Sequence, residues 1–184
     1  HQQMNQNFAQ QPPQQLLQPH QASNPVIINK PIIYGSIASL LPKNQLVENA
    51  THIWKIFVRP YDLSSCLSTW IKEVQFILHE SFPNHIRTVS KPPFVLEETG
   101  WGEFDLQIKL IFFTGENLTL YHRLRLFPDV KASRPQKHSK KPCIYEHYDE
   151  VLIQNPSQEF LTLLNKQVPS SPVYEQNYLA AANN

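Results

Sequence analysis

Residues 104–113 carry the clearest alternation of apolar and polar side chains in this chain. The apolar positions are Phe104, Leu106, Ile108, Leu110 and Phe112, and the polar positions between them are Asp105, Gln107 and Lys109. Because successive side chains of a β-strand point to opposite faces, this pattern predicts a strand with one face against a core and the other in solvent. Ile111 and Phe113 make the far end apolar on both faces, so we expect that end to be covered on both sides.

Several shorter segments show the same period of two. The positions that share a strand face are Trp54, Ile56 and Val58, then Val74, Phe76 and Leu78, and finally Leu118, Leu120, Leu124 and Leu126. Residues 114–117 supply turn chemistry before the last of these segments, and His122 interrupts its apolar face. No regular alternation of strands with helices is present. The sequence therefore predicts an all-β fold, an immunoglobulin-like antiparallel β-sandwich.

The C-terminal part predicts one more strand and a short helix. Residues 150–153 form the expected last strand. Asn155 followed by Pro156 is typical of a helix N-cap with proline at the first helical position, and Gln158 is placed for a capping box. The apolar stripe of this helix consists of Phe160, Leu161, Leu163 and Leu164. We expect the helix to end near Lys166.

The two ends of the chain differ in composition from its middle. Residues 1–25 contain nine glutamines and four prolines. They cannot bury enough apolar surface to offset the entropy of ordering, so we expect them to be disordered. Residues 26–166 are expected to form one folded domain, and the polar residues 167–184 a flexible tail. The chain begins with His1 instead of Met, and we expect it to be a fragment of a longer protein.

Charge and cysteine content argue against several classes of function. The net charge is +1, which leaves no bulk electrostatic footprint for nucleic acid or a membrane surface. No apolar run approaches the roughly 18 residues of a membrane span, and the first residues lack the apolar core of a secretory signal. Cys66 and Cys143 show no zinc-site spacing, so we expect two free thiols and neither metal nor cofactor. We interpret residues 131–142, including Lys137, as a solvated basic loop, and do not expect direct DNA contact.

Two short runs suggest a binding slot. The first is His79-Glu80-Ser81-Phe82-Pro83, and the second, residues 98–104, reads E-T-G-W-G-E-F. If the intervening turn brings the rings of Phe82 and Trp101 face to face, they form a slot with aromatic walls and the Ser81 hydroxyl at its edge. Such a slot fits a flat, neutral amide better than an ammonium ion, which it would desolvate without offering a carboxylate.

The neighbours of these rings fit the same interpretation. Gly100 and Gly102 permit close approach of the backbone and unusual backbone angles, so an N–H near Trp101 is available to an acyl oxygen. His79 is two residues from Ser81, and in an extended segment its imidazole lies on the same side and is placed to orient the hydroxyl.

From the residues alone, other interpretations stay open. Both rings are compatible with ordinary core packing, the commoner environment for such side chains. A methyl-lysine cage would need an aromatic box, usually with a carboxylate. An enzyme is not expected, because the chain has no G-x-S-x-G elbow and no acid to orient His79. We interpret Glu98 and Glu103 as solvated residues at strand ends.

The two runs, together with other landmarks, resemble the YEATS family. Residues 51–59 look like its opening strand, residues 74–83 like its central strand and first pocket loop, and residues 92–104 like its second pocket loop. Residues 30–35 and 148–150 are similar to the branch shared by histone-variant-exchange remodellers and histone acetyltransferase complexes. The resemblance covers about residues 30–166.

The resemblance implies a function. Members of the family read acylated lysine, such as acetyl- or crotonyl-lysine, on histone tails. The matching positions for the acyl-lysine pocket are His79, Ser81, Phe82, Gly100, Trp101 and Gly102. The implied partners are the acylated histone H3 tail and other subunits of a remodelling or acetyltransferase complex, and the implied location is the nucleus. A structural scaffold subunit with a weak or vestigial pocket is the alternative.

The chain departs from the family pattern at two positions. Ala50 stands where relatives place an aromatic residue or a histidine that helps to close the pocket. Arg123 stands where some members carry an acidic residue that pairs with a histone arginine. We therefore expect a looser hold on the acyl group and a changed contact with the peptide.

Overall fold

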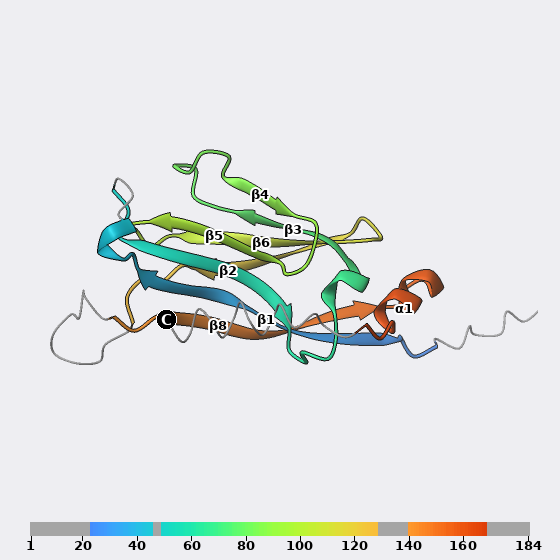
Figure 1. Ribbon diagram of the computed structural model, residues 1–184. Helices are drawn as coiled ribbons and strands as arrows, with labels where there is room; N and C mark the ends of the chain where they lie inside the picture. The colour runs from blue at the N-terminus through green and yellow to red at the C-terminus, as the bar shows by residue number, and fades with distance from the viewer. Residues whose placement is uncertain (1–22, 46–48, 129–139, 169–184) are drawn as a thin grey trace, which may run out of the picture.

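The computed structural model describes residues 23–45, 49–128 and 140–168 and consists of two stacked antiparallel sheets (Figure 1). The strands are β1 (Ile27–Leu40), β2 (His52–Pro60), β3 (Ile71–Ile77), β4 (Ile86–Val89), β5 (Val95–Gly100), β6 (Asp105–Phe112), β7 (Asn117–Arg123) and β8 (Cys143–Gln154). One sheet has the order β5-β2-β1-β8 and the other β4-β3-β6-β7. Two short 3-10 helices (Lys43–Gln45 and Leu67–Thr69) and one α-helix, α1 (Gln158–Leu164), complete the fold.

The core lies between the sheets and uses the faces that the alternation predicts. Inward-facing side chains with no more than 3% exposure include Trp54, Ile56, Val58, Val74, Phe76, Leu106, Ile108 and Leu110. The predicted turn at residues 114–117 joins β6 to β7, which pair from Asp105 with Arg123 to Ile111 with Asn117. The all-β, immunoglobulin-like sandwich with a short C-terminal helix is confirmed.

One expectation about β6 is wrong, and the polar break in the apolar face of β7 has an explanation. His122 lies on the inner face of β7, where it is 3% exposed, and its Nε2 lies 2.8 Å from the Ser36 hydroxyl oxygen. A hydrogen bond to β1 thus lets a polar ring take a core position. The far end of β6 is not covered on both sides, because Phe113 lies just beyond the strand and is 52% exposed.

The last strand and the helix begin elsewhere than predicted. β8 starts at Cys143 and pairs with β1 along its whole length; its first half is polar and aromatic, which hid it in the sequence. The N-cap of α1 is Ser157, whose hydroxyl accepts from the N–H of Phe160, and not Asn155. Asn155 instead exchanges hydrogen bonds with Val26, and the helix ends at Leu164.

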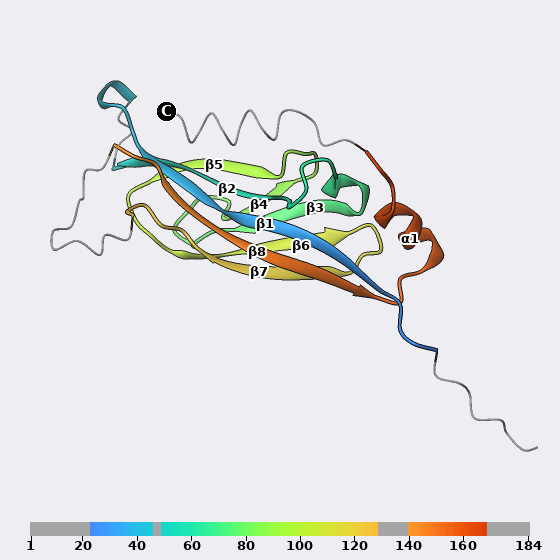
Figure 2. The same cartoon turned by 90° about the horizontal axis from the view of Figure 1, so that it is seen from below.

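The helix α1 packs at one end of the sandwich, where β1 begins and β8 ends (Figure 2). Phe160 and Leu164 are its buried residues. Residues 1–22, 129–139 and 169–184 lie outside the described residues, and they include most of the predicted disordered segment (1–25), most of the predicted basic loop (131–142) and nearly all of the predicted tail (167–184). Among the residues described, no helix is long and apolar enough to cross a membrane.

Candidate binding site

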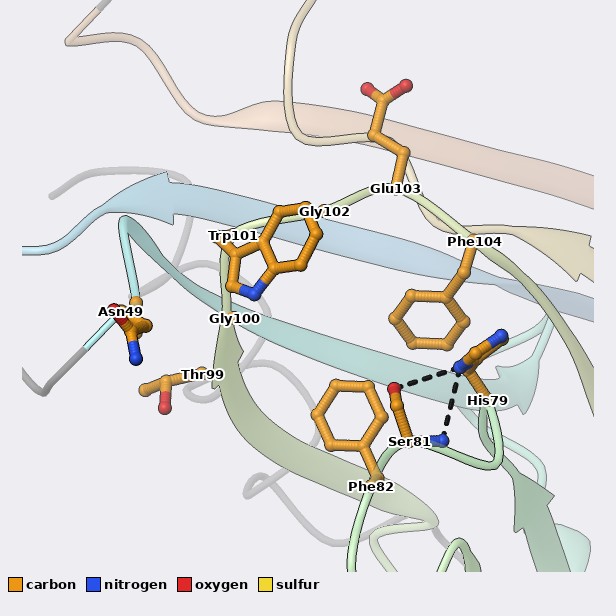
Figure 3. Close-up of a pocket in the computed structure, with 11 residues that line it drawn as sticks. Asn49, His79, Ser81, Phe82, Thr99, Gly100, Trp101, Gly102, Glu103 and Phe104 are labelled. Carbon is orange, nitrogen blue, oxygen red and sulfur yellow. Dashed lines mark hydrogen bonds between the residues drawn. The ribbon is translucent and has the colours of Figure 1, made fainter.

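All six residues selected from the sequence line one cavity of about 540 Å³. The loop between β3 and β4 supplies His79, Ser81 and Phe82, and the end of β5 with the following loop supplies Gly100, Trp101 and Gly102 (Figure 3). The first loop joins two strands of the β3 sheet, and the second runs from β5 in the β2 sheet to β6 in the β3 sheet. The pocket therefore exists because the sandwich brings the ends of two sheets together.

Two contacts between His79 and Ser81 define the polar edge of the pocket. The backbone N–H of Ser81 donates to Nδ1 of His79 at 3.1 Å, and the Ser81 hydroxyl oxygen lies 2.8 Å from the same nitrogen. A ring nitrogen that accepts from a backbone N–H carries no proton, so the hydroxyl must donate to it as well. Both lone pairs of the Ser81 oxygen are then left to accept, and an amide N–H is the matching group for a ligand to bring.

Phe82 forms a wall that is fixed from behind. Its ring meets Trp54 edge to face, with 5.9 Å between centroids, and lies 5.4 Å from the ring of Phe104. Trp54 is 1% exposed and belongs to the core. Its indole nitrogen is buried and has no hydrogen-bond partner among the described residues. Because Phe82 rests on a core side chain, its ring is already oriented before any ligand arrives.

Trp101 forms the other wall and is 70% exposed. Figure 3 shows its indole projecting from the loop after β5 on the side of the pocket opposite Phe82. A tryptophan that is this exposed contributes little to the core, and large exposed aromatic rings are typical of binding surfaces. The interpretation of this ring as core is therefore wrong.

The two glycines of the second loop differ in their surroundings. A Cβ on Gly100 would lie 3.3 Å from Nε1 of Trp54 and 3.8 Å from Cζ of Phe82, whereas a Cβ on Gly102 would meet nothing within 4 Å. The expected close approach is thus present at Gly100 and not at Gly102. The expected unusual backbone angles are present at neither, because Gly115 is the glycine with positive φ among the described residues.

Five further residues complete the lining: Asn49, Ala50, Thr99, Glu103 and Phe104. Asn49 has a φ of 63°, a conformation that asparagine tolerates better than most residues. The asparagine is thus a turn signal that was available in the sequence. Ala50 lies at the pocket, as the family pattern implied, and presents only a methyl group there. Asn49 and Ala50 are placed at the pocket because the next residue, Thr51, donates its backbone N–H to the carbonyl of Gly100.

The sequence suggested that Glu98 and Glu103 are solvated residues at strand ends, and this interpretation is wrong. The carboxylate of Glu103 accepts from the backbone N–H groups of Leu126 and Phe127, at 2.9 and 3.3 Å. It thereby ties the loop of Trp101 to the segment that follows β7. Glu98 pairs with Arg87 at 3.1 Å and accepts from the N–H of Thr99. Neither link leaves a mark in a local sequence pattern.

His52 begins β2 and pairs with Gly100 at the end of β5, beside the pocket. It is 3% exposed, its Nδ1 lies 2.7 Å from the hydroxyl of Thr51, and its ring meets Phe127 edge to face at 5.2 Å. Burial lowers the pKa of His52, and the nearby Glu103 carboxylate partly opposes that shift. The lowered pKa favours a neutral imidazole, which adds no positive charge beside Gly100, its partner on β5.

No group of three or more histidine, cysteine or acidic side chains within the described ranges is arranged to hold a metal ion. Neither Cys66 nor Cys143 forms a disulfide. The side chains that line the pocket offer aromatic rings, hydroxyls, the imidazole of His79, the amide of Asn49 and one carboxylate that is already engaged. The arrangement can enclose a flat, neutral group and offer it hydrogen bonds.

The fold and the pocket together define a β-sandwich protein with an aromatic binding slot at one end. The model of the YEATS family matches residues 49–128. The Protein AF-9 homolog of Saccharomyces cerevisiae is 37% identical over 155 residues, which cover 74% of this chain and 68% of that protein. The chain belongs to the YEATS family.

Solved structures agree with this assignment. The crystal structure of the Yaf9 YEATS domain bound to H3K27ac is 35% identical, has a TM-score of 0.66, and is matched over 77% of this chain and 95% of that one. The Yaf9 YEATS domain that recognises an H3K122suc peptide is 37% identical, with a TM-score of 0.62 and the same coverage. Both relatives bind histone H3 peptides that carry an acylated lysine.

Proposed function

We propose that this protein reads acylated lysine on histone H3 tails, in the nucleus, as a subunit of a chromatin-remodelling or histone acetyltransferase complex. The observation that carries the proposal is the Ser81 hydroxyl, which His79 holds as an acceptor beside an aromatic slot. Membership of the YEATS family and the histone H3 peptides bound by its Yaf9 relatives support the same function.

The recognition follows from the chemistry of an acylated lysine. Acylation replaces the ammonium ion by a flat amide with one donor and one acceptor. The rings of Phe82 and Trp101 would cover the two faces of that amide, each contributing about 0.5–1.5 kcal/mol beyond burial. Its N–H would donate to Ser81, and its oxygen would accept from a backbone N–H near Trp101. An unmodified lysine would lose its hydration without meeting a free carboxylate.

The contacts set a scale for affinity. Two stacking contacts and two or three hydrogen bonds of about 1 kcal/mol each, less the cost of ordering, leave roughly 4–7 kcal/mol. This corresponds to dissociation constants from about millimolar to about ten micromolar. Binding this weak is useful where other subunits hold the domain near the histone, which is the reason for proposing a subunit of a larger complex.

We propose no catalytic role. A hydrolytic mechanism would need His79 to receive a proton from Ser81 and a third group to stabilise the resulting charge. Among the described residues, the pocket offers Glu103 as its carboxylate, and that group is occupied by two backbone N–H donors. Nor do we propose direct DNA contact.

A scaffold subunit with a vestigial pocket is the second candidate, and the small side chain of Ala50 at the pocket favours it. One comparison separates the candidates. The same histone H3 peptide should be titrated in acetylated, crotonylated, trimethylated and unmodified forms. We expect measurable binding of the two acylated forms only. Tighter binding of the methylated form would exclude the acyl reader, and no binding of any form would favour the scaffold.

A further inference from the structure

Phe82 is carried by the loop between β3 and β4 of one sheet, and Trp101 follows β5 of the other sheet. Contacts between the sheets therefore help to fix the distance between the two rings. Of the ion pairs between described residues, Lys55–Glu97 and Arg59–Glu146 lie within the β2 sheet and Arg123–Asp105 lies within the β6 sheet. Only Arg87–Glu98, at 3.1 Å, joins one sheet to the other. Arg87 is on β4 and Glu98 is on β5, and each of these strands forms an edge of its sheet.

Arg87 also holds the loop that carries Phe82. Its Nη2 donates to the carbonyl of Pro83 at 2.9 Å, and its Nε donates to the carbonyl of Asn84 at 2.6 Å. These are the two residues that follow Phe82, and Asn84 has a φ of 48°, a turn conformation with little intrinsic stability. One guanidinium group therefore fixes a bent segment next to the first wall.

Glu98 makes the corresponding link to the second wall. One carboxylate oxygen accepts from Nη1 of Arg87, and the other accepts from the N–H of Thr99 at 3.0 Å. Thr99 lines the pocket two residues before Trp101. A continuous chain of hydrogen bonds thus runs from the Pro83 and Asn84 carbonyls through the ion pair to the strand that ends in Trp101.

We propose that Arg87 and Glu98 are positioning residues that set the width of the acyl slot. The inference rests on the proposed function and deepens it, because the width of the slot determines which acyl groups fit. Neither residue lines the pocket, so each acts through the loops and not by touching the ligand. A slot held at the thickness of one flat group favours planar acyl chains, such as crotonyl, over saturated chains of the same length, such as butyryl.

We call the Arg87–Glu98 link, with its hydrogen bonds to Pro83, Asn84 and Thr99, the brace. Its chemistry requires arginine. Its planar fork offers donors in several directions and can reach two carbonyls and a carboxylate at once, whereas a lysine ammonium is a single point of charge on a flexible stem. Both side chains are about one-quarter exposed, so the ion pair by itself stabilises the fold only slightly. We therefore expect its loss to be seen mainly in the geometry of the pocket.

The test compares neighbouring glutamates. Dissociation constants for acetylated, crotonylated and butyrylated H3 peptides should be measured for Arg87→Lys, Arg87→Met, Glu98→Gln and the double variant of Arg87→Met with Glu98→Gln. Glu97→Gln and Lys55→Met are the matched controls, since Glu97 is next to Glu98 on β5 but its ion pair with Lys55 on β2 lies within one sheet. We expect Arg87→Met and Glu98→Gln each to weaken crotonyl binding about five- to tenfold, with Arg87→Lys intermediate.

Two further results are expected. The double variant should bind no more weakly than the worse single variant, because both changes break the same link. The preference for crotonyl over butyryl should fall towards one in the brace variants and remain unchanged in the controls. Crotonyl affinities of the brace variants within twofold of wild type, or an equal effect of Glu97→Gln and Glu98→Gln, would overturn the inference.

Hydrogen exchange separates failure of the brace from failure of the proposed function. Without any peptide, Arg87→Met and Glu98→Gln should accelerate amide exchange in both residues 80–85 and residues 99–104. Faster exchange in both segments, combined with a wild-type protein that binds no acyl peptide, would refute the reader and keep the brace. Unchanged exchange in either segment would refute the brace even where wild-type binding is observed.

Discussion

The ring of Phe82 stands edge-on against the indole of Trp54, with 5.9 Å between the centroids and 86° between the planes. Because of this contact, the two aromatic walls of the pocket differ in how firmly they are held by the core. Phe82 is anchored to a side chain of the core, while Trp101 is 70% exposed and makes no ring contact with the residues that the structure describes. Removal of the two rings should therefore have different consequences.

Trp101→Ala should weaken acyl-peptide binding strongly and leave the fold intact. Loss of one stacking face should cost at least about tenfold in affinity. The thermal midpoint should change by no more than about 2 °C, because the side chain is mostly in solvent. Calorimetry and peptide titration measure both quantities. Trp54→Ala is the contrast: it should destabilise the fold by about 3–5 kcal/mol. A large fall in stability for Trp101→Ala, with no binding by the wild type, would favour the scaffold.

Ser81→Ala should weaken binding of acetylated and crotonylated peptides about five- to twentyfold, since it removes the acceptor for the amide N–H. The side chain is exposed, so the free energy of unfolding should stay within about 0.5 kcal/mol of wild type. His79→Ala should give a smaller loss of affinity, because the hydroxyl remains but is no longer oriented. Equal binding by Ser81→Ala and wild type would contradict the assigned hydrogen bond.

Gly100→Ala should reduce acyl-peptide binding, whereas Gly102→Ala should not. A Cβ at position 100 lies 3.3 Å from Nε1 of Trp54 and 3.8 Å from the Phe82 ring, so either the rings or the strand must shift. A Cβ at position 102 enters open space. We expect a loss of roughly fivefold or more for the first variant and less than twofold for the second. The reverse order would show that the base of the pocket is not at Gly100.

Ala50→Phe should tighten binding of crotonylated peptide about two- to fivefold. The methyl group of Ala50 lines the pocket and leaves room for an apolar side wall against the acyl chain. The added ring would bury apolar surface of both partners on binding. Titration of acetyl and crotonyl peptides against both proteins tests this. Weaker binding of both peptides would indicate that this side of the pocket must stay open.

Stability should fall as the pH decreases from about 6.5 to about 4. Burial, with a smaller contribution from His147, lowers the pKa of His122 from 6.5 to about 4. Within this window the unfolded chain binds a proton that the folded chain does not, so acid favours unfolding, by about 2–3 kcal/mol in total. Above pH 6.5 the imidazole is neutral in both states and the effect disappears. His52, whose pKa is also lowered, acts in the same direction.

Denaturant unfolding measured at several pH values checks this prediction. His122→Gln keeps a partner for Ser36 but cannot titrate, so its free energy of unfolding should depend less steeply on pH between 4 and 6.5. The rings that contact the imidazole are those of Tyr34, Tyr145 and His147. Identical slopes for the variant and wild type would place the acid sensitivity elsewhere.

The strands with regular alternation and the two runs that meet at the pocket could be predicted from the residue pattern alone. Trp54, Val74 and Ile108 could be placed on inner faces because the period of a strand is a local property. The walls, Phe82 and Trp101, could be selected because their neighbours resemble a family pattern. Only the apolar end of β8 could be predicted from the sequence, because its first half is positioned by pairing with β1.

The links that hold the loops of the pocket in place depend on the tertiary structure and could not be predicted from the sequence. The links Arg87–Glu98, Glu103 to the N–H groups of Leu126 and Phe127, and His122–Ser36 join residues that are 11 to 86 positions apart in the chain. Each is a hydrogen bond or ion pair between elements, and its existence depends on strand order and register, not on periodicity. A polar residue on a strand looks the same in the sequence whether it faces water or closes such a link, and only the fold distinguishes the two.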